Sequence, residues 1–188
     1  MFDFLEIKTI YTIIHLFGIA IGAGGVFASD LIFFRSIRDG ELSSTEFGFL
    51  ELGGKMVWTG LLILIISGVL LFSLDPDKYL ASSKFLVKVT IVAIIIANGL
   101  LLHLKLIPNF KKCIKEGAMS LGEYVRSNPF VLMSGVVSGV SWSSAIILGA
   151  LRSIPYSYWV ILSVYVAILL FGVVGAFLFK SHFFPKSQ

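Results

Sequence analysis

Residues 9–29, TIYTIIHLFGIAIGAGGVFAS, form an apolar run that carries no charged residue and one histidine, His15. At about 1.5 Å per residue, a helix of this length crosses a hydrocarbon core about 30 Å thick. Similar runs follow at 56–74, 89–104, 129–151 and 153–179. Because lipid offers no hydrogen-bond partner to an open backbone, each run is expected to be a transmembrane helix.

The composition agrees with this interpretation. The chain has 188 residues, of which 57% are hydrophobic and 14% are charged, and its mean hydropathy is +0.95. We therefore predict an all-α, single-domain (1–188) membrane bundle of five transmembrane helices, at about 9–34, 55–74, 84–107, 129–151 and 156–179. A single cysteine, Cys113, excludes a disulfide framework and a Cys-x-x-Cys metal site.

The distribution of basic residues predicts the topology. Ten of the fifteen Lys and Arg residues lie on the side shared by the first loop, the third loop and the C-terminus. The positive-inside rule places that side in the cytoplasm and the N-terminus outside. We expect a multi-pass protein of the cell's inner (plasma) membrane, with the lipid bilayer as its surroundings and no nucleic acid as a partner.

Three loop features bear on the helix ends. Ser43 or Ser44, followed by Glu46, is typical of a helix start and predicts a short helix at the membrane surface. Asp75 and Pro76 end the second span, and Ser82 or Ser83 is a plausible cap for the third.

The first run raises the main functional question. His15, Gly18, Gly22, Gly25 and Ser29 are spaced by 3, 4, 3 and 4 residues, so they share one face of a helix. A strip of small residues suits either close packing of a neighbouring helix or a flat cofactor. The imidazole could bond to a neighbouring helix, ligate haem iron or copper, or relay protons.

Other polar residues lie inside or beside the spans. Lys88 enters the third span at a depth similar to that of His15, and it either reaches the headgroups or pairs with an anion such as a cofactor propionate. Gly99 lies three turns further on the same face, near His103, which is a metal-ligand candidate at the opposite membrane side or an interfacial residue. Asp30 is expected to form a helix-end ion pair with Arg35.

Parts of this pattern resemble known families. His15 followed by the small pair Gly24-Gly25 resembles the first helix of CopD copper-resistance membrane domains and of HemJ-type protoporphyrinogen oxidases. SSKFLVKVTIVAIIIANG, residues 82–99, resembles their next signature, a lysine a few residues into the third helix. Arg35 stands where these families often have a basic residue, and the similarity covers about residues 10–110.

The resemblance implies two functions. In HemJ-type proteins it implies haem b, with the helix-one histidine as iron ligand and the helix-three lysine essential beside it, roles that would fall on His15 and Lys88. In the CopD-like group it implies copper handling across the inner membrane.

We therefore expect a haem b-binding redox protein that transfers electrons or oxidises a porphyrin-type or lipid-soluble substrate, as a HemJ-like oxidoreductase would. His15 is the expected ligand and Lys88 the catalytic counter-charge, while Gly18, Gly22, Gly25 and Gly99 give the cofactor room. The alternatives are a CopD-like copper transport protein and a non-catalytic membrane subunit. We also expect a membrane redox partner and assembly into a homo-oligomer.

Overall fold

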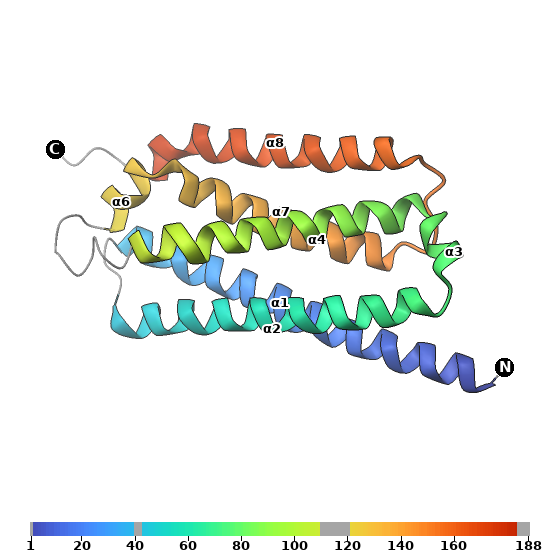
Figure 1. The fold of residues 1–188 in the computed structure, drawn as a ribbon. Coiled ribbons are helices and arrows are strands. Elements are labelled where there is room, and N and C mark those ends of the chain that lie inside the picture. Colours follow the sequence, from blue (N-terminus) through green and yellow to red (C-terminus); the bar gives the residue numbers. More distant parts are fainter. Residues whose placement is uncertain (1, 40–42, 110–120, 184–188) are drawn as a thin grey trace.

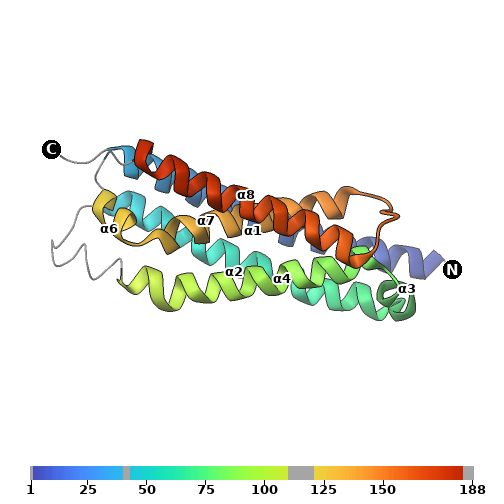
Figure 2. The same cartoon turned by 90° about the horizontal axis from the view of Figure 1, so that it is seen from above.

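The computed structural model describes residues 2–39, 43–109 and 121–183, and all regular structure in these ranges is helical. The long helices run side by side along one axis (Figures 1 and 2). In chain order the elements are α1 (Phe2–Asp39), α2 (Ser44–Ser73), α3 (Pro76–Leu80), α4 (Ser83–Leu101), the π-helical turn η1 (Leu102–Leu106), α6 (Leu121–Ser127), α7 (Pro129–Ala150) and α8 (Tyr158–Phe183).

Five of the described helical segments are long and apolar enough to cross a membrane, which confirms the predicted fold class. Successive spans run in opposite directions, so the start of α1, α3 and the α7–α8 connection lie at one end of the bundle (Figure 1). The end of α1, the start of α2, α6 and the end of α8 lie at the other end. The spans cover Glu6–Ile37, Ser44–Ser73, Ser83–Asn109, Pro129–Ala150 and Tyr158–Leu178.

The largest difference from the predicted boundaries is at the start of the second span. Ser43 and Glu46 form a capping box, in which the Ser43 hydroxyl accepts from the Glu46 N–H at 3.2 Å and Glu46 accepts from the Ser43 N–H. The expected surface helix and the expected span beginning at about 55 are therefore one helix. It continues through Gly53 and Gly54, because nothing in that stretch interrupts the backbone ladder.

The other end signals act as predicted. Asp75 caps α3 by accepting from the Lys78 N–H at 3.3 Å, with Pro76 in the first turn. Ser82 caps α4 by accepting from the Phe85 N–H at 3.4 Å. The basic cluster of the third loop and Cys113 lie outside the described residues.

The long helices form two groups. One group is the α1–α2 pair, and the other comprises α4, α7 and α8, which pack on one another. The groups meet where α1 contacts α7 and where side chains of α2 reach α4, as in the stacked rings of Phe72 and Phe85, whose centroids are 5.7 Å apart. Figure 1 shows the α1–α2 pair on one side and α8 on the opposite side of the bundle.

Glycine allows the α1 and α2 backbones to touch. A Cβ at Gly60 would lie 2.6 Å from the Gly22 Cα and 2.7 Å from the Gly18 O, and one at Gly25 would lie 2.9 Å from the Gly53 O. Real Cβ atoms do not approach other atoms so closely. Small residues at these positions therefore set the helix separation.

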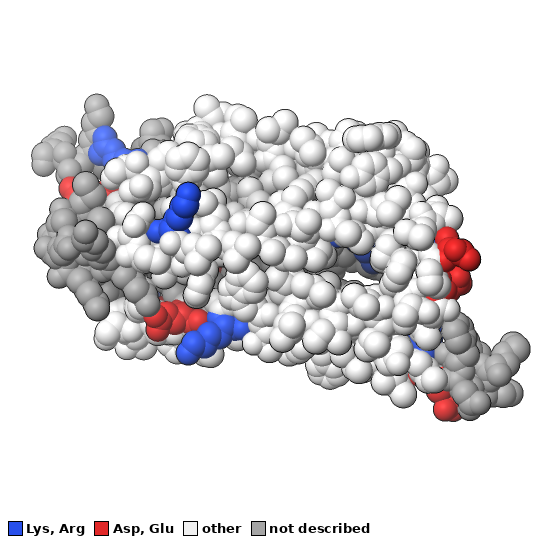
Figure 3. Space-filling view, viewed as in Figure 1, with Lys and Arg blue, Asp and Glu red and all other residues white. Residues whose placement is uncertain are grey.

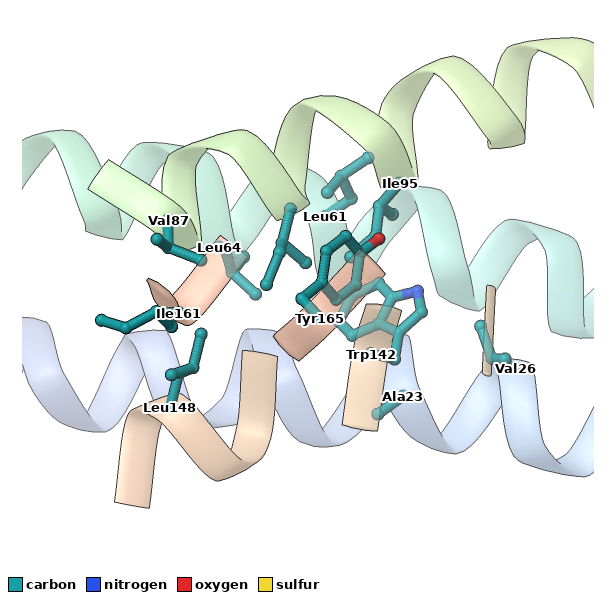
Figure 4. Packing of buried hydrophobic residues seen from close by; sticks show 11 residues of the cluster. Ala23, Val26, Leu61, Leu64, Val87, Ile95, Trp142, Leu148, Ile161 and Tyr165 are labelled. Carbon is teal, nitrogen blue, oxygen red and sulfur yellow. The ribbon is translucent and has the colours of Figure 1, made fainter. Parts of the chain in front are cut away.

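The core lies between the two groups of helices. Trp142 of α7 is completely buried, and its indole ring lies directly on Gly22 of α1, so that Gly22 has no room for a Cβ. Ala23, Leu61, Ile91, Ile95 and Tyr165 are other buried members of this cluster (Figure 4).

Paired polar side chains join α4, α7 and α8. Asn98 donates to the Ser134 carbonyl at 3.0 Å and accepts from the Ser134 hydroxyl at 2.9 Å, and the Ser141 and Tyr165 hydroxyls lie 2.8 Å apart. Lys84 donates to the Leu151 carbonyl at 2.6 Å, where the last carbonyls of α7 attract a cation. These bonds satisfy polar groups that lipid would leave unpaired.

We expect Gly60→Ala to lower the free energy of unfolding by about 1–3 kcal/mol, since its methyl group would strike the α1 backbone. Thermal unfolding in detergent measures the effect. Gly24→Ala is the control, because a Cβ there has no neighbour within 4 Å and alanine favours the helix. Equal melting temperatures for the two variants would contradict the proposed backbone contact.

Candidate functional site

Polar side chains within the spans gather at two places between the helix groups. Near the α3 end lie His15 of α1, Ser67 of α2 and Lys88 of α4. Near the α6 end, Asp30 of α1 and His103 of η1 line a common cavity. The two histidines therefore lie at opposite ends of the bundle, as predicted, and do not share one centre.

His15 is oriented by a serine on the neighbouring helix. Its Nδ1 lies 2.9 Å from the Oγ of Ser67, which is fully buried. The Ser67 hydroxyl is itself 2.6 Å from the Ile63 carbonyl, to which it donates. Because that hydrogen is used, the Ser67 oxygen accepts from Nδ1–H, and this tautomer leaves a lone pair on Nε2 of His15.

Glycine gives the imidazole ring its place against α2. A Cβ at Gly68 would lie 3.7 Å from Cε1 of His15, which is ordinary contact distance. A branched side chain at position 68 would therefore press on the ring. The His15 side chain itself is only partly buried.

Lys88 carries an unpaired charge in this region. Its Nζ lies 3.8 Å from the Cβ position of Gly149, near the end of α7, and it makes no hydrogen bond or ion pair with any residue in the described ranges. The ammonium lies within electrostatic range of His15 and of Lys84. Lys88 therefore lies between the helices without an anionic partner among the described residues, which leaves a place for an anionic ligand.

The surface is hollowed close to this level. Figure 3 shows an opening between α2 and α4, toward the α3 end, with Lys or Arg atoms in its depth. The opening fits the separation of the α2 and α4 backbones, which approach each other at few positions. A ligand entering here would come from the lipid-facing side of the bundle.

The glycine strip of α1 does not face this opening. The Gly18 and Gly25 faces are covered by the α2 backbone, and the Gly22 face is covered by Trp142 and Gly60. In the structure these glycines are therefore the positions where neighbouring helices pack closely on α1. A flat cofactor on this strip would have to displace α2, so the geometry favours helix packing over a cofactor role for Gly18, Gly22 and Gly25.

Gly99 and His103 belong to the other end of the bundle. A Cβ at Gly99 would lie 3.4 Å from Cζ2 of Trp58, and His103 follows in η1 as an exposed residue. Both line a cavity of about 230 Å³ that also reaches Asp30. Gly99 thus lies near His103, as expected, but it does not line the His15 and Lys88 region, with which it was expected to share a cofactor.

Asp30 differs from its expected role. Its carboxylate oxygens face the small residues of α7, at 3.9 Å from the Gly135 and 3.7 Å from the Gly139 Cβ positions, and it forms no ion pair with Arg35. The predicted helix-end pair is therefore absent. In the described residues no group of three or more His, Cys, Asp or Glu side chains is arranged to hold a metal ion.

Three residues near His15 were not predicted from the sequence. Ser67 and Gly68 lie in the middle of an apolar span, and Gly149 lies at the end of another. The one sequence feature that could have indicated them is a serine next to a glycine, Ser67 and Gly68, on the helix that packs on α1.

No family model, curated protein or solved structure matches this chain. The resemblance to CopD and HemJ-type proteins therefore stays an expectation based on a few positions. Function has to be argued from the site itself.

We expect Ser67→Ala to lower the free energy of unfolding by about 1–3 kcal/mol, because it removes the hydrogen bond between the Ser67 hydroxyl and Nδ1 of His15. Thermal unfolding in detergent is the measurement. Ser73→Ala is the matched control, since Ser73 is an exposed serine of the same helix that donates only to the Leu70 carbonyl. A Ser67→Ala protein as stable as the Ser73→Ala protein would contradict the bond.

Proposed function

We propose that this protein is an integral membrane redox protein that binds haem b through His15, with Lys88 as the counter-charge to a haem propionate. One observation carries the proposal: a histidine whose Nδ1 is bonded to Ser67 lies within electrostatic range of an ammonium without a partner among the described residues, and both are inside membrane-spanning helices. An ionisable residue within a span is by default a functional candidate.

The chemistry of His15, Ser67 and Lys88 suits haem. Metal-ligating histidines usually donate their second ring N–H to an orienting partner, and Ser67 plays that part for His15. A propionate would neutralise Lys88, for which the described residues supply no anion. The glycine strip contributes nothing, so the proposal depends on His15, Lys88 and the opening between α2 and α4.

Each residue has a separate task in the proposed protein. His15 would hold the haem iron, Ser67 orients the imidazole ring, and Lys88 would bind the acidic side of the ligand. Haem would supply one-electron chemistry when bound. We propose a lipid-soluble or porphyrin-type molecule as substrate or electron partner, because the hollow is reached from the lipid-facing side.

We also propose the orientation and the membrane. The α6 end, with the larger share of basic residues, faces the cytoplasm, and the α3 end with His15 and Lys88 faces outward across the inner membrane.

The purified protein, produced in a host supplied with haem, is expected to show a Soret absorption band that is lost in His15→Ala. His103→Ala is the matched control and should keep the band, since His103 lies at the opposite end of the bundle. If the His15→Ala protein is folded and its spectrum is unchanged, His15 is not the ligand. A wild-type protein that never takes up haem would end the proposal.

The orientation is tested with thiol labelling, because Cys113 is the one cysteine of the chain. A membrane-impermeant maleimide should label Cys113 only after the cells are permeabilised. In a Cys113→Ser background, Asp77→Cys in α3 should be labelled in intact cells. The reverse pattern would place His15 and Lys88 on the cytoplasmic side.

A further inference from the structure

The cavity near the α6 end has features that the proposed haem site does not use. It has a volume of about 230 Å³ and is lined by residues of α1, α2, α4, η1, α6 and α7. It therefore lies where both helix groups and the short connecting elements meet. His15 and Lys88 are not among its lining residues.

A carboxylate inside the bundle is the main polar group of this cavity. Asp30 is partly buried, lies within the first span and makes no hydrogen bond or ion pair with any described residue. The nearest surfaces on α7 are Gly135 and Gly139, which offer no side-chain donor. A charge held in this way calls for a counter-ion, since leaving it unpaired in a span is costly.

Three further titratable side chains line the cavity, and one of them is a second carboxylate that has an interaction of its own. Glu51 and His103 are exposed residues that line the cavity, and Tyr124 lines it from α6. No Lys or Arg is found among the described lining residues. A cation is therefore favoured over an anion or a neutral molecule.

Aromatic rings supply the rest of the surface. Phe33, Phe47 and Trp58 line the cavity from α1 and α2, and apolar side chains of α4 and α7 complete it. Rings of this kind attract cations through their π faces while they also accept an apolar body. Carboxylate and aromatic rings together are suited to an ammonium group on a hydrocarbon frame.

A buried donor next to the cavity has no partner. The Nε1–H of Trp142 makes no hydrogen bond, although the side chain is fully buried. Figure 4 shows this nitrogen on the side of the ring that faces Val26, which lines the cavity. This donor cannot bond to an ammonium, which has no acceptor. The buried Oγ of Ser29, which lines the cavity next to Asp30, has no hydrogen-bond partner among the described residues either and could accept from an ammonium.

We propose that this cavity is a second ligand site that binds a small organic cation, a protonated amine carried on an apolar body. Asp30 is the counter-ion, and the aromatic side chains surround the ammonium and its hydrocarbon part. His103, which also lines the cavity, lies within the π-helical turn η1, a type of distortion frequent at functional sites. The proposal is independent of haem binding at the other end.

The probe for this site is 2-phenylethylammonium, with neutral 2-phenylethanol and anionic 3-phenylpropanoate as probes of similar size. Binding to the full-length protein in detergent is measured by calorimetry, supported by the fluorescence of Trp58. The ammonium should bind about ten- to hundredfold more tightly than the alcohol, since a charge-assisted bond is worth that factor. The carboxylate probe should not bind.

Two variants locate the site. Asp30→Asn should weaken ammonium binding about tenfold or more and leave any Soret band intact, whereas Asp77→Asn, an acidic residue of α3 at the other end, should change nothing. Gly54→Leu should abolish binding while the protein stays folded, because Gly54 lines the cavity and a Cβ there meets nothing within 4 Å.

Three results would overturn the proposal. Equal affinity for the three probes would show an apolar pocket without charge recognition. Unchanged ammonium binding in Asp30→Asn would remove the carboxylate from the site. Absence of binding by every probe would mean that a proton alone satisfies Asp30.

Discussion

Close contact between the α1 and α2 backbones positions most of the polar groups described above. Gly18, Gly22 and Gly25 on one helix face Gly53 and Gly60 on the other, and no larger residue fits at these contacts. The same approach brings the His15 ring within hydrogen-bond distance of Ser67, and it leaves Asp30 turned toward α7. Helix separation here is set by the absence of side chains, since the hydrophobic effect gives little attraction between helices in lipid.

Most of the fold could be predicted from the sequence. Apolar length determines the number of spans, and alternation of direction then fixes which loops share a side. The predicted start of the second span was wrong. The helix α2 begins at Ser44, but its first turns after Ser43 are charged and of low hydropathy, so they look like a loop in the sequence. The π-helical turn η1 could not be predicted either, since no residue in its sequence, LHLKL, is typical of such a turn.

Less of the candidate site could be predicted. The depth of His15 and Lys88 follows from counting residues into each span, and the two do lie within electrostatic range. Ser67 gave no signal, because a serine in an apolar span usually bonds only to its own helix, as Ser67 also does to Ile63. Asp30 was assigned to Arg35 by proximity along the chain, whereas helix rotation turns its carboxylate toward Gly135 and Gly139. Which residues of two helices face each other depends on tertiary packing. The periodicity of a single helix gives no information about it.

The pairing of α1 with α2 has a consequence for biogenesis. Every glycine of that contact lies before residue 61, so the first two spans contain all that is needed for their mutual fit. A ribosome-bound intermediate ending just after α2 could leave the insertion machinery as a finished helical hairpin. The three later spans would then assemble against a preformed surface, with Trp142 seating on Gly22 as the step that joins the two halves.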